Sequence, residues 1–192
     1  MNFKFFGVCV EISYIFACTL VLFIANDKTG VFLPFLISVI IHELAHILLL
    51  LIFGCKLKRV KLLFGTVGLE YEENIKDSEK LFSLAAGPFS NLLAAVAFFS
   101  LGFKTLFVIN LVLAIYNLFP IKGLDGGDIL EILLSRFATL KTIKIIQFTS
   151  SLLILIPILF LAVLNAKVLF TNYSLILFSL YLILQFVFKK LG

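Results

Sequence analysis

Long apolar runs with almost no charge constrain this sequence more than any other feature. The chain has 192 residues, of which 62% are hydrophobic, and its mean hydropathy is +1.18. A soluble domain is about half apolar, whereas a helix that crosses a bilayer needs roughly 20 mostly apolar residues. The sequence therefore predicts an all-α polytopic membrane protein with about six transmembrane helices. The expected spans are Val8–Ala25, Val31–Phe53, Leu81–Phe103, Thr105–Phe119, Ile145–Asn165 and Val168–Phe188.

The lysines and arginines predict the orientation of these spans. With six spans, 13 of the 16 basic residues fall on one side of the membrane, and only Lys28, Lys104 and Lys167 fall on the other. Cytoplasmic loops are enriched in basic residues, so both termini are expected in the cytoplasm. The net charge of +5 is then explained by topology in a lipid bilayer, and no nucleic-acid partner is expected.

Three short features complete the expected layout. The segment Lys56–Asn74 alternates polar and apolar residues on both sides of Phe64-Gly65, which predicts a β-hairpin at the membrane surface between the second and third spans. Glu11 is expected near the cytoplasmic end of the first span, reaching the interface or a polar cavity. The three cysteines form no CxxC pair and are interpreted as small apolar fillers; they are Cys9, Cys18 and Cys55.

The strongest chemical signal lies inside the second span, in VIIHELAHILLLLIFG, Val39–Gly54. His42 and His46 are four residues apart, so on a helix their imidazoles share one face and can bind one metal ion. Glu43 lies beside them, and HExxH is a zinc-hydrolase signature in which the glutamate acts as base. At about 1.5 Å per residue the pair lies past mid-membrane, toward the cytoplasm. The alternative is a pair of core histidines bonded to neighbouring helices.

A third metal ligand is expected, because catalytic zinc usually takes three protein ligands and a water molecule. The best candidate segment is NLFPIKGLDGGDIL, where Pro120 ends the fourth span and glycines let the chain bend back. Asp125 lies between an apolar residue and two glycines. Asp128 is the rival ligand, and its structural alternative is to favour the start of a helix over Ile129–Arg136.

Three motifs in one order resemble the site-2 proteases, the intramembrane zinc metalloproteases of peptidase family M50. They are HELAH, AAGPFSN (Ala85–Asn91) and NLFPIKGLDGG (Asn117–Gly127), within residues Val31–Ile132. The resemblance implies that His42, His46 and Asp125 hold one zinc ion and that Glu43 is the general base. It also favours Asp125 over Asp128, and the hairpin before the third span matches a family element.

Other motif residues carry weaker expectations. Asn91 could donate to the oxyanion or orient the substrate, or could form an interhelical hydrogen bond beside the small residues of the third span. Asn117 could pair backbone groups that are freed where Pro120 breaks the helix. The remaining residues that support the motifs are Gly87, Pro88, Gly126 and Gly127.

The compact layout is most similar to the sporulation branch of the family, that of stage IV sporulation protein FB. The resemblance implies a membrane-tethered protein substrate, in that branch a pro-sigma factor, and a membrane inhibitor or regulatory subunit. Residues 1–192 are expected to form a single transmembrane metalloprotease domain, with no PDZ domain between Gly54 and Lys80 and no CBS domain. The rival function is a divalent-metal transporter that uses the buried His/Asp cluster. A third reading is an inactive scaffold.

Overall fold

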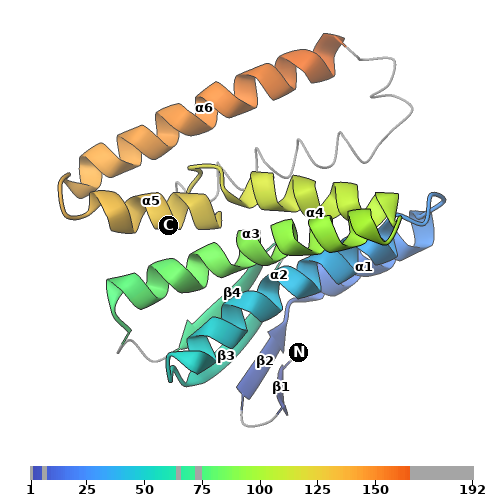
Figure 1. Cartoon of the computed structure of the whole chain (residues 1–192), viewed down its shortest axis with the longest axis horizontal. Helices are drawn as coiled ribbons and strands as arrows, with labels where there is room; N and C mark the ends of the chain where they lie inside the picture. The colour runs from blue at the N-terminus through green and yellow to red at the C-terminus, as the bar shows by residue number, and fades with distance from the viewer. Residues whose placement is uncertain (1, 6–7, 64–65, 72–74, 165–192) are drawn as a thin grey trace. The chain divides into compact units, whose positions relative to one another are not determined.

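The computed structural model describes residues 2–5, 8–63, 66–71 and 75–164 (Figure 1). The chain divides into two compact units, Met1–Ile143 and Lys144–Gly192. The first unit contains four strands and the helices α1 to α5, and it carries every residue of the expected site. Helix α6 (Leu140–Leu164) begins in the first unit, and most of its length belongs to the second. The last expected span, Val168–Phe188, lies outside the described residues.

Helices dominate the first unit. Helix α3 packs against α2, α4 and α5, and α2 also contacts α4 (Figure 1). Among the described residues, α2 and α3 are long and apolar enough to cross a membrane, whereas α4 and most of α1 form shorter apolar helices. Two of the six expected spans thus coincide with helices that are candidates, by length and composition, to cross a membrane. The bounds of the helices are α1 Tyr14–Asn26, α2 Phe32–Ile52, α3 Asp77–Ser100, α4 Lys104–Asn117 and α5 Asp125–Leu134.

Helix α2 has its polar residues inside and its apolar residues outside. The buried face carries Ser38, His42, His46 and Leu50. The opposite face exposes large apolar side chains, namely Leu33, Ile37, Ile40, Leu44, Leu48 and Leu51. A helix of a water-soluble protein shows the reverse pattern, with its apolar stripe turned inward. This arrangement therefore favours lipid, not water, around the outer face of α2.

The loop before α2 caps the N-terminus of this helix through the side chain of Asp27. The Asp27 carboxylate accepts hydrogen bonds from the backbone N–H groups of Thr29, Val31 and Phe32, at 3.1, 3.3 and 2.9 Å. These bonds satisfy amide groups that have no partner inside the helix. The bond from Phe32 makes the largest contribution to lowering the pKa of Asp27 below 3.8. The loop thus fixes where α2 begins, and so which residues of α2 face inward.

A small sheet joins the N-terminus to the segment between α2 and α3. It contains β1 (Asn2–Phe5), β2 (Val8–Ile12), β3 (Leu57–Leu63) and β4 (Thr66–Tyr71), in that order. Strands β3 and β4 are antiparallel, which confirms the expected hairpin. Strands β1 and β2 are also antiparallel, and β2 runs parallel to β3. The sheet is therefore larger than the predicted hairpin.

The predicted start of the first span at Val8 is wrong. Residues Val8–Ile12 form β2, and helix α1 begins only at Tyr14. Glu11 consequently lies on a strand, where its carboxylate is 3.5 Å from the Arg59 guanidinium. An apolar segment of five residues looks the same in a strand as in a helix, and its pairing partner β3 lies far away in the sequence.

Candidate metal centre

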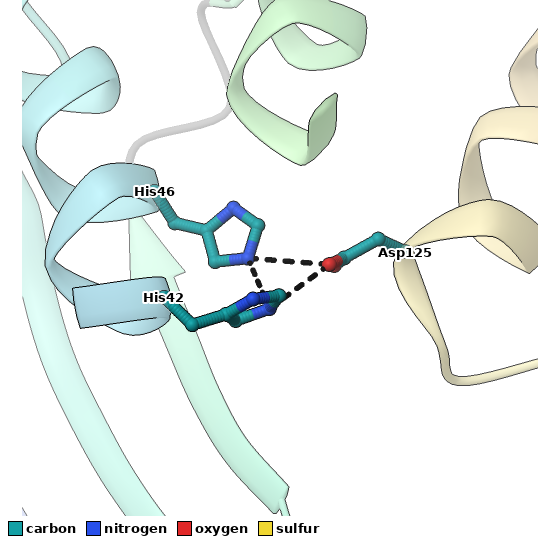
Figure 2. Close-up of side chains that lie close together, drawn as sticks. All are labelled: His42, His46 and Asp125. Carbon is teal, nitrogen blue, oxygen red and sulfur yellow. Dashed lines mark hydrogen bonds and ion pairs between the residues drawn. The ribbon is translucent and has the colours of Figure 1, made fainter. Parts of the chain in front are cut away.

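Helix α2 presents both histidines to the first turn of α5 (Figure 2). The two Nε2 atoms are 3.1 Å apart. The Asp125 Oδ2 atom lies 3.1 Å from His42 Nε2 and 3.4 Å from His46 Nε2. The histidines are only 6% and 7% exposed, and the Asp125 side chain is 15% exposed. Three potential ligand atoms from two distant segments thus converge in a largely buried place.

The other ring nitrogen of each histidine is held by a hydrogen-bond acceptor. His42 Nδ1 lies 2.6 Å from Asn91 Oδ1, and His46 Nδ1 lies 2.7 Å from the backbone oxygen of Ser83. Oxygen atoms of this kind only accept, so both imidazoles donate from Nδ1. In the neutral rings each Nε2 atom then carries a lone pair that is directed at the Asp125 carboxylate. Such outer partners are typical of histidines that bind a metal.

These three facing atoms fit a zinc ion. Two lone pairs and a carboxylate oxygen repel one another at 3.1–3.4 Å unless a cation lies among them. Asp125 Oδ2 is also buried without a hydrogen-bond partner. Bonds of about 2.0–2.1 Å in a tetrahedral zinc site place neighbouring ligand atoms about 3.3 Å apart. The separations match that edge, and the donors are the nitrogen and oxygen atoms that zinc prefers.

Gly87 of α3 is required for the histidines to occupy this position. A Cβ atom added at Gly87 would overlap both imidazole rings, with His42 Cε1 at 2.6 Å. Any other residue would therefore displace the rings or separate α3 from α2. The close packing expected from the small residues of the third span is found here. Helix α3 is continuous through Gly87 and Pro88, although Pro88 removes one backbone donor.

The turn before α5 sets the position of Asp125. Gly123 has a φ of +94°, a left-handed conformation that favours glycine, and it turns the chain back after α4. Gly126 and Gly127 were expected to let the chain bend back, but their role is to allow close packing against the preceding segment. A Cβ at Gly126 would overlap the backbone of Leu118 and Phe119, and one at Gly127 would overlap the backbone of Ile121. Helix α5 begins at Asp125, four residues before the predicted start.

The remaining predicted residues lie near the centre or beside it. Glu43 is half-buried on α2, close enough to interact electrostatically with His42, His46 and Asp125. Asp128 lies one turn along α5 and is not part of the converging group. Asn117 donates from Nδ2 to the Leu113 backbone oxygen in its own helix, at 3.0 Å, and Pro120 follows the end of that helix.

Asn91 is fully buried and uses all of its polar atoms. Its oxygen accepts from His42, and its nitrogen donates to the Ser38 backbone oxygen at 3.1 Å and to Asn110 Oδ1 at 2.8 Å. Both amide hydrogens are thus committed, which favours the interhelical role over donation to an oxyanion. Ser38 and Asn110 were not among the residues predicted to belong to the site. The available signal was a single polar residue that interrupts an apolar stretch, Ser38 between Ile37 and Val39 and Asn110 between Ile109 and Leu111.

Comparison with known proteins places the chain in a peptidase family. The family model described as Peptidase M50B-like matches residues 12–121, and the model of Peptidase family M50 matches residues 102–164. Zinc metalloprotease MJ0392 of Methanocaldococcus jannaschii is 29% identical over 178 residues, covering 82% of this chain and 52% of that protein. Stage IV sporulation protein FB of Bacillus subtilis is 35% identical over 112 residues, covering 53% of this chain and 39% of that protein.

A solved structure has the same fold. The Site-2 Protease from Methanocaldococcus jannaschii superposes with a TM-score of 0.68 at 24% identity, over 95% of this chain and 91% of that one. The matched family models define the class of protein as the M50 peptidases. The chain belongs to peptidase family M50, the family of the site-2 proteases. It spans about half the length, or less, of the curated relatives that it matches.

Proposed function

We propose that this chain is an intramembrane zinc metalloprotease that hydrolyses a peptide bond in or near a transmembrane segment of a membrane-tethered protein. The observation that carries the proposal is the convergence of His42 Nε2, His46 Nε2 and Asp125 Oδ2. Both histidines carry their ring proton on Nδ1, on the side away from this group. Family membership and the inward-facing polar face of α2 support the same function.

In this proposal His42, His46 and Asp125 hold one zinc ion. When bound there, zinc would polarise the scissile carbonyl and activate a water molecule. The Glu43 carboxylate, on the same turn of α2, takes the proton of the attacking water and passes it to the nitrogen of the leaving amine. Asn91 holds His42 in position, and Gly87 leaves room for both imidazoles.

The sheet supplies a surface on which an unwound substrate could be held. Strand β4 is at the end of the sheet order, and no described strand pairs with its outer side. A substrate helix must unwind before cleavage, and in lipid its freed backbone groups need new partners. We infer that the substrate pairs with β4 as an added strand. Proline substitutions along Thr66–Tyr71 should then reduce cleavage and spare zinc content; unchanged cleavage across the scan contradicts this inference.

Orientation and substrate follow from charge and from one relative. The excess of basic residues favours cytoplasmic termini and an active site toward the cytoplasm in a six-span layout. The match to stage IV sporulation protein FB makes a membrane-bound pro-sigma factor the first substrate to test. A membrane inhibitor or regulatory subunit belongs to the same proposal and can be tested by co-expression.

The Glu43→Gln variant tests the proposed function and separates it from metal transport. Glutamine has nearly the same size and leaves the metal ligands intact, but it cannot take a proton from water. Co-expression of wild type or variant with a tethered substrate should give the shorter product only with wild type, while both bind zinc equally. Cleavage of the substrate by the Glu43→Gln variant contradicts the proposal. The proposal is also contradicted if wild type cleaves nothing while both wild type and variant carry zinc into vesicles.

A further inference from the structure

Two polar residues, Ser38 in α2 and Asn110 in α4, lie completely buried within otherwise largely apolar helices. Neither belongs to the converging metal ligands. A polar group in such surroundings destabilises the protein unless its hydrogen bonds are made, and within an apolar helix it is usually functional. Their partners show what they do.

A single chain of hydrogen bonds runs from these residues to His42. The His42 Nδ1–H donates to Asn91 Oδ1, and Asn91 Nδ2 donates to Asn110 Oδ1 at 2.8 Å. Asn110 Nδ2 donates in turn to Ser38 Oγ at 2.8 Å, and Ser38 Oγ–H donates to the Pro34 backbone oxygen, also at 2.8 Å. Every bond in the chain therefore points away from the metal centre.

Backbone oxygens fix this direction. Asn110 Nδ2 also donates to the Leu106 backbone oxygen at 2.8 Å, so the amide nitrogen must lie on that side and Oδ1 must face Asn91. Asn91 Nδ2 likewise donates to the Ser38 backbone oxygen. If the Asn91 amide were flipped, its oxygen would face Asn110 Oδ1 and the Ser38 backbone oxygen. Oxygen–oxygen repulsion opposes that flip.

We propose that Asn110 is a positioning residue for the metal centre and acts through Asn91. By accepting from Asn91 it keeps the Asn91 oxygen toward His42, which holds the His42 proton on Nδ1 and the Nε2 lone pair toward the metal. Ser38 supports Asn110 from the other side. The inference rests on the proposed metal-binding function, since only a metal ligand requires one fixed tautomer.

The Asn110→Leu variant breaks the chain at its second link. Leucine has a similar size but accepts no hydrogen bond, so one Asn91 amide hydrogen loses its partner. The flipped orientation of the Asn91 amide then becomes less unfavourable in energy. A flipped amide would direct an N–H toward the His42 Nδ1–H. Loss of an outer partner of a metal ligand typically weakens metal binding by about 10–100-fold. For a residue one step removed, we expect the lower end, about 10-fold.

Zinc affinity, measured by chelator competition on the detergent-purified full chain, provides the first test. We expect Asn110→Leu to weaken zinc binding, and Asn110→Asp to weaken it less, because an oxygen still faces Asn91 although the other oxygen then meets the Leu106 backbone oxygen. In the Asn91→Leu background Asn110→Leu should have no further effect, because its route to His42 is gone. Losses that add fully in the double variant, or an unchanged affinity in Asn110→Leu, overturn the proposal.

The histidine ring protons provide a local readout. The chain has only two histidines, so zinc-loaded protein labelled with 15N-histidine gives two Nδ1–H signals. In Asn110→Leu the His42 signal should shift and exchange faster with solvent, while the His46 signal, held by the Ser83 backbone oxygen, stays unchanged. The proposal fails if the His42 signal is unchanged or if both signals move equally.

A milder variant covers the case in which Asn110→Leu does not fold. Ser38→Ala removes the Oγ atom that accepts from Asn110 and donates to the Pro34 backbone oxygen, and it should shift the same His42 signal by less. Ser100→Ala is the matched control, because Ser100 Oγ also donates to a backbone oxygen one turn back but accepts from no asparagine in the described part of the chain. Equal spectra for the two serine variants contradict the proposal. Neither readout depends on peptide cleavage, so a chain that binds zinc without proteolysis would lose only the proposed function.

Discussion

Asn91 in α3 and Arg59 in β3 both bond to polar groups from distant parts of the chain, but in different surroundings. Asn91 is fully buried, and its bonds to His42, Ser38 and Asn110 measure 2.6–3.1 Å. The Arg59 side chain is 43% exposed, and it lies 3.5 Å from Glu11 and 3.7 Å from Glu70. Hydrogen bonds strengthen in a low-dielectric interior, whereas exposed ion pairs are screened by water. The buried hydrogen bonds between the helices are therefore expected to contribute more to stability than the exposed ion pairs of the sheet.

The sheet nevertheless has its own charge order. Glu70 forms an ion pair with Lys61, and this hydrogen bond makes the largest contribution to lowering the pKa of Glu70 below 4.5. Both side chains are partly exposed. The cluster Glu11, Arg59, Lys61 and Glu70 spans β2, β3 and β4, so it favours one register of the strands. A surface cluster of this kind tolerates the loss of single members.

The largest difference between the two regions is expected when one methyl group is added at a glycine of each. Gly87→Ala places Cβ into both imidazoles, and overpacking of this kind costs about 1–3 kcal/mol or displaces the rings. Zinc content and cleavage should fall together. Gly68→Ala in β4 is the control, because its Cβ would lie 3.6 Å from Lys61, an ordinary contact, and should change stability by less than about 0.5 kcal/mol. Full zinc binding by Gly87→Ala would mean that α3 can move away freely.

A smaller effect is expected from the exposed charges. Glu11→Gln removes one partner of Arg59, and an exposed ion pair contributes about 0–1 kcal/mol. The thermal unfolding midpoint in detergent should therefore change little, and the change should shrink further in high salt. Asn91→Leu, measured in parallel, should lower the midpoint clearly, because it leaves His42 Nδ1 and Asn110 Oδ1 without their hydrogen-bond partner. Equal losses from both variants would contradict the contrast between the two regions.

The smallest effect is expected at the loop before α2. Since the folded pKa of Asp27 lies below 3.8, its carboxylate stabilises the fold fully above 3.8, and this stability is lost as the pH falls through the folded value. Asp27→Asn keeps an acceptor for the backbone amides but does not titrate. The difference in unfolding midpoint between wild type and Asp27→Asn should vanish on acidification. A difference that is constant with pH would remove Asp27 as the titrating cap.

Several features of the site could be predicted from the sequence because local rules generate them. The spacing of His42 and His46 fixes a common helix face in any helix, and the alternation around residues 64–65 indicates a hairpin. Asp125 lies within reach of both histidines, where the family resemblance put a ligand. The predictions of the helix face and of the hairpin needed no knowledge of how the elements pack, whereas the prediction of Asp125 needed the family resemblance.

The remaining features depend on contacts between distant segments. Strand β2 looked like the beginning of a helix, because parallel pairing with β3 leaves no local signature. The roles of Gly126 and Gly127 depend on which backbone lies against them, and the spacing of glycines does not reveal this. Asn110 was visible as one of two amide side chains in the apolar helix α4, but only packing shows that it faces Asn91.

The central claim is that Asp125 completes a zinc site with the two histidines of α2. The most direct measurement is the zinc content of purified wild type, Asp125→Asn and Asp128→Asn. Asparagine keeps the size of each side chain and removes its charge, and Asp128 lies on the same helix outside the converging group. We predict about one zinc ion per chain in wild type and Asp128→Asn, and its loss in Asp125→Asn. Full zinc content in Asp125→Asn, with loss in Asp128→Asn, would contradict the account.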